Sequence, residues 1–217
     1  MKYLSECLED TLDSARIERK FVMTKGQCIL AESRLKSIGF KRLYESRAVS
    51  SIYFDDIDHS CLRDNVDGSP SRDKIRFRTY NEDYETSIIE TKHKRGVVGY
   101  KTTYKLDDKV KNQDHLVSLG KSWCDNNLLD ILAPSSRVDY IRSYYIRDQF
   151  RATIDYKIRS SRLAGKKSIT SAMYDYSVIE FKYSVDLDEQ FRSIYRVFSD
   201  IAMRNTKSSK YSNSLMY

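Results

Sequence analysis

Alternation of apolar and polar residues dominates this chain. In several stretches every second residue is apolar, which is typical of a β-strand with one buried face. The pattern predicts strands at residues 17–23, 48–55, 74–80, 85–94, 100–106, 138–147, 150–158 and 176–183. The glycine-containing segment 95–99 predicts a hairpin between two of them. The chain is therefore expected to be rich in strands.

Three other stretches repeat apolar residues at the spacing of a helix. The pattern predicts helices over residues 25–38, 114–132 and 188–203, with Gly39 ending the first and Pro134 ending the second. Their apolar faces include Ile29, Leu30 and Leu35 in the first, Leu116, Leu119 and Trp123 in the second, and Phe191, Ile194, Phe198 and Ile201 in the third. We expect these faces to pack in the core.

Composition indicates a folded domain and excludes several classes of protein. The chain has 217 residues, of which 40% are hydrophobic and 32% charged, so low-complexity and disordered classes are excluded. We find neither a repeat nor a linker, and expect a single domain over residues 1–217. No apolar run approaches the roughly 20 residues of a membrane span, and no signal peptide is evident, which predicts a cytoplasmic protein.

Charged residues gather on one face of the predicted strands. Lys74, Arg76 and Arg78 alternate with apolar Ile75 and Phe77. The same parity aligns Glu18 with Lys20, Glu90 with Lys92, Lys101 with Lys105, Tyr140 with Arg142, Arg151 with Asp155, and Glu180 with Lys182. For a single antiparallel strand such a face is ordinary, because it usually meets water.

The sign of the charges favours a less ordinary arrangement. Arginine and lysine dominate the polar faces, and neighbouring stripes would repel one another unless an anion lay between them. A closed antiparallel barrel with a charged interior, covered by helices outside, explains this pattern; an open sheet with a basic face is the alternative. Arginine and lysine match phosphate oxygens, and scattered glutamates suit Mg²⁺ or Mn²⁺. Glycine-rich phosphate loops are absent, so side chains must hold the phosphate.

The C-terminal segment Lys207-Ser208-Ser209-Lys210 allows two interpretations. It is either a solvated, frayed tail or a cluster that closes one end of the barrel on phosphate. The sequence leaves both open.

An ordered set of motifs carries a family resemblance. The set is Glu18-Arg19-Lys20-Phe21, Ser51-Ile52-Tyr53-Phe54-Asp55, Lys74-Ile75-Arg76-Phe77-Arg78-Thr79-Tyr80, Glu90-Thr91-Lys92, Val138-Asp139-Tyr140-Ile141-Arg142, Arg151-Ala152-Thr153-Ile154-Asp155, Val178-Ile179-Glu180-Phe181-Lys182 and Lys207-Ser208-Ser209-Lys210-Tyr211. Together they resemble the catalytic domain of the vacuolar transporter chaperone (VTC) polyphosphate polymerases, which belong to the triphosphate tunnel metalloenzymes. The resemblance runs from about Arg16 to Tyr211. At Arg16 the wider superfamily often has a glutamate.

The resemblance implies a fold, a reaction and a site. The fold would be α+β, an antiparallel eight-stranded β-barrel tunnel flanked by a few helices. The reaction would transfer the γ-phosphate of ATP to inorganic polyphosphate with Mn²⁺ or Mg²⁺. The implied residues are Arg76, Arg78, Lys92, Arg142 and Arg151 for catalysis, Lys20, Lys105, Tyr140, Lys207, Ser209 and Lys210 for substrate binding, and Glu180 for the metal ion. Lys101 is an alternative to Lys105.

Two other functions remain open. One is a tripolyphosphatase or nucleoside triphosphatase of the same fold, in which Glu18, Glu90 or Asp155 activates water. The other is a non-enzymatic binder of polyphosphate or nucleic acid, for which the net charge of +7 and the 17 tyrosines would serve. Glutamates within the basic face favour a metal-dependent enzyme, so we expect no nucleic-acid partner.

Overall fold

The computed structural model describes residues 7–9, 16–95, 98–106, 109–127, 129, 131–206 and 209–216. The strands are β1 (Cys7–Glu9), β2 (Arg16–Met23), β3 (Lys41–Asp55), β4 (Ser71–Tyr80), β5 (Asp83–Arg95), β6 (Val98–Lys105), β7 (Ala133–Arg147), β8 (Phe150–Ala164), β9 (Lys167–Met173), β10 (Ser177–Ser184) and β11 (Arg204–Asn205). The helices are α1 (Lys25–Ser37), α2 (Ser60–Val66), α3 (Gln113–Asn126), α4 (Asp188–Arg196) and α5 (Lys210–Met216), with 3-10 turns at Val185–Leu187 and Ser199–Ile201.

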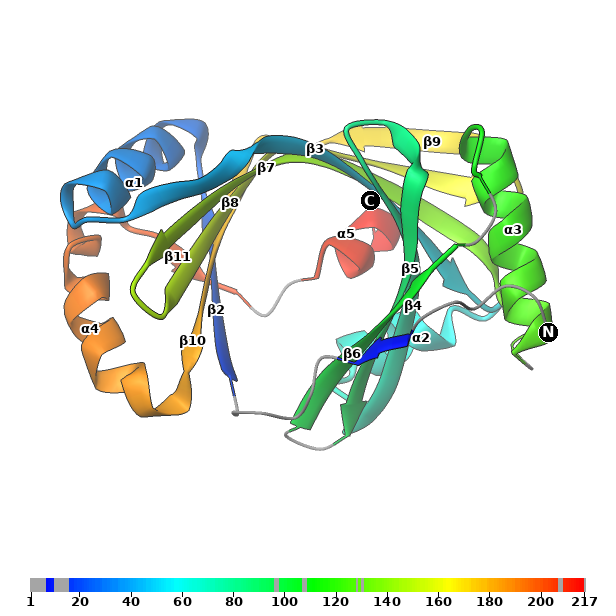
Figure 1. Cartoon of the computed structure of the whole chain (residues 1–217), viewed down its shortest axis with the longest axis horizontal. Helices are drawn as coiled ribbons and strands as arrows, with labels where there is room; N and C mark the ends of the chain where they lie inside the picture. Colours follow the sequence, from blue (N-terminus) through cyan, green and yellow to red (C-terminus); the bar gives the residue numbers. More distant parts are fainter. Residues whose placement is uncertain are drawn as a thin grey trace.

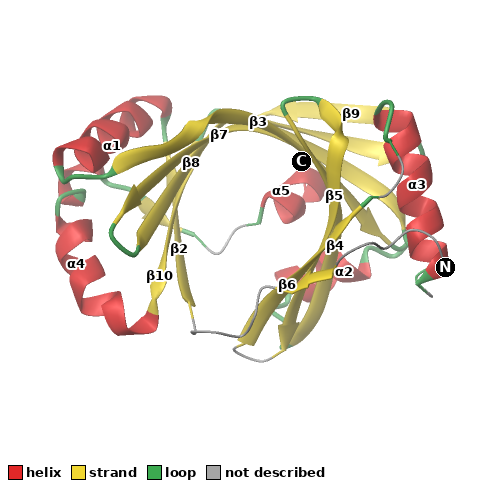
Figure 2. Ribbon diagram, viewed as in Figure 1, coloured by secondary structure: helices red, strands yellow, loops and turns green. Residues whose placement is uncertain are grey.

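One antiparallel sheet of 11 strands curls around a central space (Figure 1). Its order is β1-β6-β5-β4-β3-β7-β8-β10-β2-β11, with β9 attached to β8. Helices α1 and α4 cover one outer side of the curl and α3 covers the opposite side, while α5 lies within the curve (Figure 2). The strand-rich antiparallel fold with few helices is therefore confirmed.

The sheet departs from the predicted barrel in closure and in strand number. Among the described residues, no pairing joins the β1–β6 edge to the β2–β11 edge, so the sheet is curled and not closed. All eight predicted strands are present, and β1, β9 and β11 are additional. Register shifts interrupt the pairing of the long strands β3 with β7 and β7 with β8. Because such bulges bend and twist a sheet, they contribute to its curl. Beside the shift between β7 and β8, Lys157 has a φ of 51°.

Two predicted helices end early. Helix α3 stops at Asn126, and Pro134 lies in β7 opposite Phe54, because proline is tolerated at the start of a strand. Helix α4 stops at Arg196 and is followed by the 3-10 turn at Ser199–Ile201. Residues 128 and 130 of the predicted helix 114–132 lie outside the described residues.

The first helix forms where the sequence predicts it but buries a different face. Thr24 and Gln27 cap the helix reciprocally at its start, and Gly39 follows its end with a φ of 90°, which favours glycine. The buried residues are Ala31 and Leu35. Ile29 and Leu30 are 72% and 56% exposed, so their predicted place in the core is wrong.

Two apolar cores lie on the outer side of the curl. Residues of β2, β8 and β10 pack against α1 and α4 in the first core, and residues of β3, β4 and β5 pack against α3 in the second. A Cβ atom at Gly120 of α3 would lie 2.6 Å from a ring atom of Phe54, so glycine lets α3 approach the sheet closely. Because these cores bury the apolar strand faces, the charged faces turn inward.

A third apolar cluster lies on the inner face, which the charge pattern did not predict. Val49 and Tyr53 of β3 and Val138 of β7 pack there against Tyr211 and Leu215 of α5. Figure 1 shows α5 inside the curve of the sheet. The C-terminal helix therefore fills part of the central space.

Candidate active site

Strand register brings the charged residues together on the inner face. Arg76 lies directly opposite Glu90 on β5 and Tyr53 on β3. Glu180 lies opposite Lys20 on β2. Residues directly opposite one another on paired strands point to the same face, so the predicted parity of the charges is confirmed.

A first group, which we call the arginine cluster, consists of Arg76, Arg78, Glu90, Arg142 and Asp155. The Glu90 carboxylate is buried and lies 2.7 Å from Nε of Arg76 and 3.3 Å from Nη1 of Arg78. Burial opposes ionisation of Glu90, but the two guanidinium groups outweigh it and hold its pKa far below the usual range. These cations therefore favour the ionised form of Glu90 at neutral pH.

Arg142 and Asp155 form the second pair of the arginine cluster. Two guanidinium nitrogens of Arg142 donate to the two Asp155 oxygens, at 2.6 and 2.8 Å. Lys210 of α5 also donates to Asp155. Burial opposes ionisation here too, yet Arg142 and Lys210 lower the pKa of Asp155 to about 2. Arg76, Arg78, Arg142 and Lys210 are thus already paired with carboxylates, so the expectation that these cations need a bound anion to avoid repulsion is too strong.

Hydroxyl groups complete the surroundings of the arginines. Arg78 donates to Ser51 Oγ at 3.1 Å and to Tyr140 Oη at 3.2 Å, and Arg76 Nη1 lies 3.4 Å from Tyr53 Oη. The guanidinium groups of this cluster are therefore held in fixed orientations by several partners each.

A second group, the lysine cluster, consists of Glu18, Lys20, Lys92, Glu180 and Lys182. Lys182 Nζ bridges the two carboxylates, 2.8 Å from Glu18 and 3.4 Å from Glu180. Burial opposes ionisation of Glu180, but Lys182 and then Lys20 outweigh it, and its pKa lies well below normal. For Lys92, burial and then Arg76 disfavour the charged form and lower the pKa to about 7.

The C-terminal segment packs on the inner face of the curled sheet. Lys74 donates to Ser209 Oγ at 3.2 Å, and Tyr211 donates to buried Asp55. Lys210 contacts Asp155 and lies 4.8 Å from the ring centroid of Tyr140. The frayed-tail interpretation is therefore wrong for residues 209–216. Lys207 lies outside the described residues.

Two of the predicted site residues are exposed. Arg151 is exposed near the start of β8, opposite Lys182, and makes no ion pair with any described residue. Lys105 is exposed at the end of β6, whereas Lys101 Nζ lies 3.1 Å from Glu90. Of the two alternatives, the structure brings Lys101 to the arginine cluster.

Strand β3 supplies polar side chains that the site prediction left out. Ser51, Tyr53 and Asp55 share the inner face, between apolar Ile52 and Phe54 on the outer face. The signal was the alternation itself, but serine and tyrosine in an apolar strand resemble ordinary core residues.

The carboxylates suit a divalent metal ion that also binds phosphate. In the part of the chain that the structure describes, no three histidine, cysteine or acidic side chains converge as a ready metal site. Glu180 and Glu18 are nevertheless neighbours through Lys182 and are ionised. Mg²⁺ and Mn²⁺ are commonly held by one or two carboxylates together with substrate phosphates. These two residues fit such an ion.

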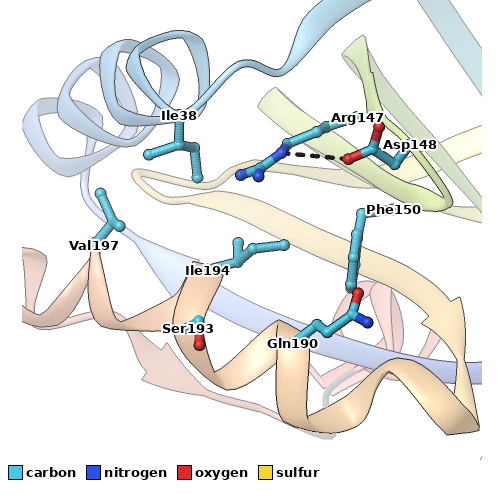
Figure 3. A pocket seen from close by; sticks show the side chains of 8 residues that line it. All are labelled: Ile38, Arg147, Asp148, Phe150, Gln190, Ser193, Ile194 and Val197. Carbon is cyan, nitrogen blue, oxygen red and sulfur yellow. Dashed lines mark ion pairs between the residues drawn. The ribbon is translucent and has the colours of Figure 1, made fainter.

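We call the central space inside the curled sheet the tunnel. A separate cavity of about 310 Å³ lies outside it, between α1, α4 and the β7–β8 hairpin (Figure 3). Its lining combines Ile38, Ile194 and Val197 with the Arg147–Asp148 pair, whose closest atoms are 3.6 Å apart. It lacks the buried charges of the two clusters, so we place the candidate active site in the tunnel.

Comparison with solved structures identifies the class of fold. A "putative adenylate cyclase" from Bacillus halodurans superimposes with a TM-score of 0.57 at 18% identity, covering 90% of this chain and 95% of that one. Another from Vibrio parahaemolyticus has a TM-score of 0.57 at 14% identity, covering 94% and 99%. A putative adenylyl cyclase from Hippeastrum, described as having a dominant triphosphatase activity, has a TM-score of 0.53 at 14% identity, covering 91% and 94%. The fold is that of the triphosphate tunnel proteins.

The family follows from the sequence match. The VTC domain matches residues 15–217, and the chain belongs to this family. No curated protein matches. Family and fold together indicate an enzyme of the triphosphate-tunnel kind, a class that binds triphosphate substrates and generally depends on a divalent metal ion. None of the described helices is long and apolar enough to cross a membrane.

Proposed function

We propose that this chain is a metal-dependent polyphosphate polymerase, acting as one catalytic domain over residues 1–217. It transfers the γ-phosphate of ATP to the end of an inorganic polyphosphate chain. A cytoplasmic location remains an expectation from the sequence. The observation that carries the proposal is the pairing of every buried tunnel carboxylate of the two clusters with a cation.

That pairing bears on the choice of nucleophile. Glu90, Asp155 and Glu180 all have lowered pKa values, because neighbouring cations outweigh the effect of burial. A carboxylate with so low a pKa is a poor general base at neutral pH. The terminal phosphate of polyphosphate is already partly deprotonated at this pH and needs no such base. The electrostatics therefore support phosphate, in preference to water, as the attacking group.

The arginine cluster is suited to hold the phosphates. Arg76, Arg78 and Arg142 present planar donors that match phosphate oxygens, and their fixed orientation favours a defined position of the γ-phosphorus. An oxygen of the terminal polyphosphate group forms the new bond to that phosphorus. The bond from the γ-phosphorus to the bridging oxygen breaks, and ADP leaves.

The lysine cluster provides the remaining charge balance. Lys20, Lys92 and Lys182 face Glu180 and Glu18, so cations and the candidate metal ligands lie together. Glu180, with Glu18 beside it, would hold a divalent ion, which would supply Lewis-acid stabilisation of the charge that develops on the phosphate oxygens. The positively charged side chains bind and orient the substrate around that point.

Product analysis tests the proposal directly. Purified protein is incubated with ATP and Mn²⁺ or Mg²⁺, ADP and orthophosphate are quantified, and the product is sized on a gel. We expect chains that lengthen with time and ADP in excess of free orthophosphate. Stoichiometric orthophosphate without chains would overturn the polymerase proposal.

The second candidate is a triphosphatase of the same fold. Its support is Glu18, which pairs with Lys182 at 2.8 Å but is 39% exposed, against 9% for Glu180, so it is the more open of these two carboxylates to water. The fold neighbour from Hippeastrum, described as a triphosphatase, is compatible with this candidate. The same product analysis separates the two.

A further inference from the structure

A tyrosine–arginine cluster lies on the inner face beyond the arginine cluster. It consists of Tyr44 and Arg47 of β3 and Tyr144 of β7. The Arg47 guanidinium carbon lies 5.0 Å from the Tyr44 ring centroid and 5.9 Å from that of Tyr144. The two rings meet edge to face, with centroids 5.6 Å apart. Two aromatic rings therefore flank one cation.

Register places this cluster in the tunnel. Tyr44 lies directly opposite Tyr144, and Arg47 lies directly opposite Arg142. Tyr144 follows Arg142 by two residues on the same strand, so both point to the same face, about 7 Å apart along the strand. The charge on Arg142 is also the strongest influence that lowers the pKa of Tyr144, although burial outweighs it and raises that pKa.

Along β7 the cluster lies beyond the residues that α5 contacts. Along β7, Ser136 contacts Ser214 of α5, and Tyr140 lies beneath Lys210. Arg142 and then Tyr144 follow in the direction away from the helix. Tyr44 is 49% exposed, so part of its ring is available to a ligand.

The chemistry of this cluster differs from that of the phosphate-holding clusters. Arg47 makes no ion pair with a carboxylate among the described residues, and its guanidinium group lies against the two rings. Aromatic rings and a flat guanidinium group form a surface on which a nucleobase stacks. A phosphate group would gain nothing from the rings.

We infer that the tyrosine–arginine cluster is a stacking site for the base of a nucleoside triphosphate. This inference rests on the proposed function, because it requires the triphosphate to be held at the arginine cluster. The spacing of about 7 Å between Arg142 and Tyr144 leaves room for a ribose between the phosphates and the base. The chain then recognises both ends of its nucleotide, with separate groups of residues.

The test compares two ligands that share a triphosphate and differ in the base. Affinities for ATP and for inorganic tripolyphosphate are measured without metal ion, by calorimetry, on the wild-type chain and on Tyr44→Leu and Tyr144→Leu. We expect each variant to bind ATP about tenfold more weakly, as for the loss of one stacked base, and to bind tripolyphosphate within twofold of wild type. Tyr44→Phe keeps a ring and is expected to retain ATP affinity.

Tyr100→Leu is the matched control. Tyr100 belongs to β6 but stacks on His93, with ring centroids 4.7 Å apart, away from the two charged clusters. Its loss should change neither affinity. Equal weakening of both ligands in the Tyr44 and Tyr144 variants, or unchanged ATP affinity, would overturn the stacking site while leaving the proposed function intact. A wild-type chain that binds neither ligand would overturn the proposed function and the stacking site with it.

Discussion

The arginine cluster and the lysine cluster line the same tunnel but are built differently. In the arginine cluster Arg76 lies 2.7 Å from Glu90 and Arg142 lies 2.6 Å from Asp155, and the carboxylate side chains are 3% and 1% exposed. In the lysine cluster Lys20 and Lys182 are 32% and 38% exposed, and their contacts to Glu18 are 3.8 and 2.8 Å. The arginine cluster is therefore buried and has short ion pairs, whereas the lysine cluster is more exposed to solvent and includes a longer ion pair.

The difference follows from the side chains. A guanidinium group stays charged and forms directional pairs with a carboxylate, so it is suited to a fixed scaffold. An ammonium group changes its pKa readily when buried, as Lys92 does. We expect the arginine cluster to determine position and stability, and the lysine cluster to adjust its charge to the ligand.

The largest expected effect is on catalysis, at Glu180, one of the two carboxylates of the lysine cluster. Glu180→Gln removes a charged oxygen from the candidate metal site, because an amide is a weaker ligand. We expect ATP consumption with Mn²⁺ or Mg²⁺ to fall by about 100-fold or more, a loss of about 3 kcal/mol of transition-state stabilisation.

Tripolyphosphate affinity without metal ion is the control for Glu180→Gln. This affinity should equal that of the wild-type chain, because the arginine cluster is unchanged. Near-normal activity would remove Glu180 from the mechanism and direct attention to Glu18.

The second prediction concerns the stability of the arginine cluster. Arg76→Met deletes the closest partner of the buried Glu90 carboxylate and leaves Arg78 and Lys101 beside it. An unpaired buried charge is strongly destabilising, and the two remaining cations reduce that cost, so we expect a loss of about 2 kcal/mol. Urea unfolding measures it, and an unchanged or higher stability would contradict the scaffold role.

The third prediction is a pH dependence that arises in the lysine cluster. Bound triphosphate favours the protonated form of Lys92, whose pKa in the unliganded chain is about 7. Affinity without metal ion should therefore fall as the pH rises above 7, by at most about tenfold per pH unit. Lys74, with a pKa also lowered to about 7 by burial and then by Lys20, adds to the effect.

The variant Lys92→Met isolates the contribution of one lysine. Titration of the triphosphate itself affects both proteins equally, so the difference between their pH profiles belongs to Lys92. Parallel profiles from pH 6 to 8.5 would show that Lys92 keeps a constant charge.

The smallest expected effect is on stability within the lysine cluster. Lys182→Met removes a partly exposed cation, and pairs of this kind contribute about 1 kcal/mol or less. Urea unfolding measures the loss of stability in Lys182→Met, which is then compared with the loss in Arg76→Met. Equal losses in the two variants would erase the distinction between the clusters.

Much of the fold and site was predictable because alternation is local. The parity of Arg76 and Arg78 against Ile75 and Phe77 fixes which face of β4 is apolar, and the helices that cover that face have their own periodicity. The helix ends were less predictable. Pro134 signals a helix stop, yet the pairing of β7 with β3 places it in a strand.

The partners of each charge could not be predicted, since they depend on register. The sequence shows an excess of cations and suggests repulsion, whereas cross-strand pairing places Arg142 on Asp155 and Arg76 on Glu90. The exposed position of Arg151 could not be predicted either: it shares the parity of Asp155 but lies near the start of its strand.

The sequence by itself determined the strand-rich class, the inward charges and the residue types that match phosphate, because each depends on neighbours a few positions apart. Tertiary structure decided that the sheet curls without closing and that the C-terminal residues form a helix within it. It also gathered Tyr44, Arg47 and Tyr144 into one cluster. These features depend on bulges, register and contacts between segments far apart in the chain, and the burial they produce has no local signature.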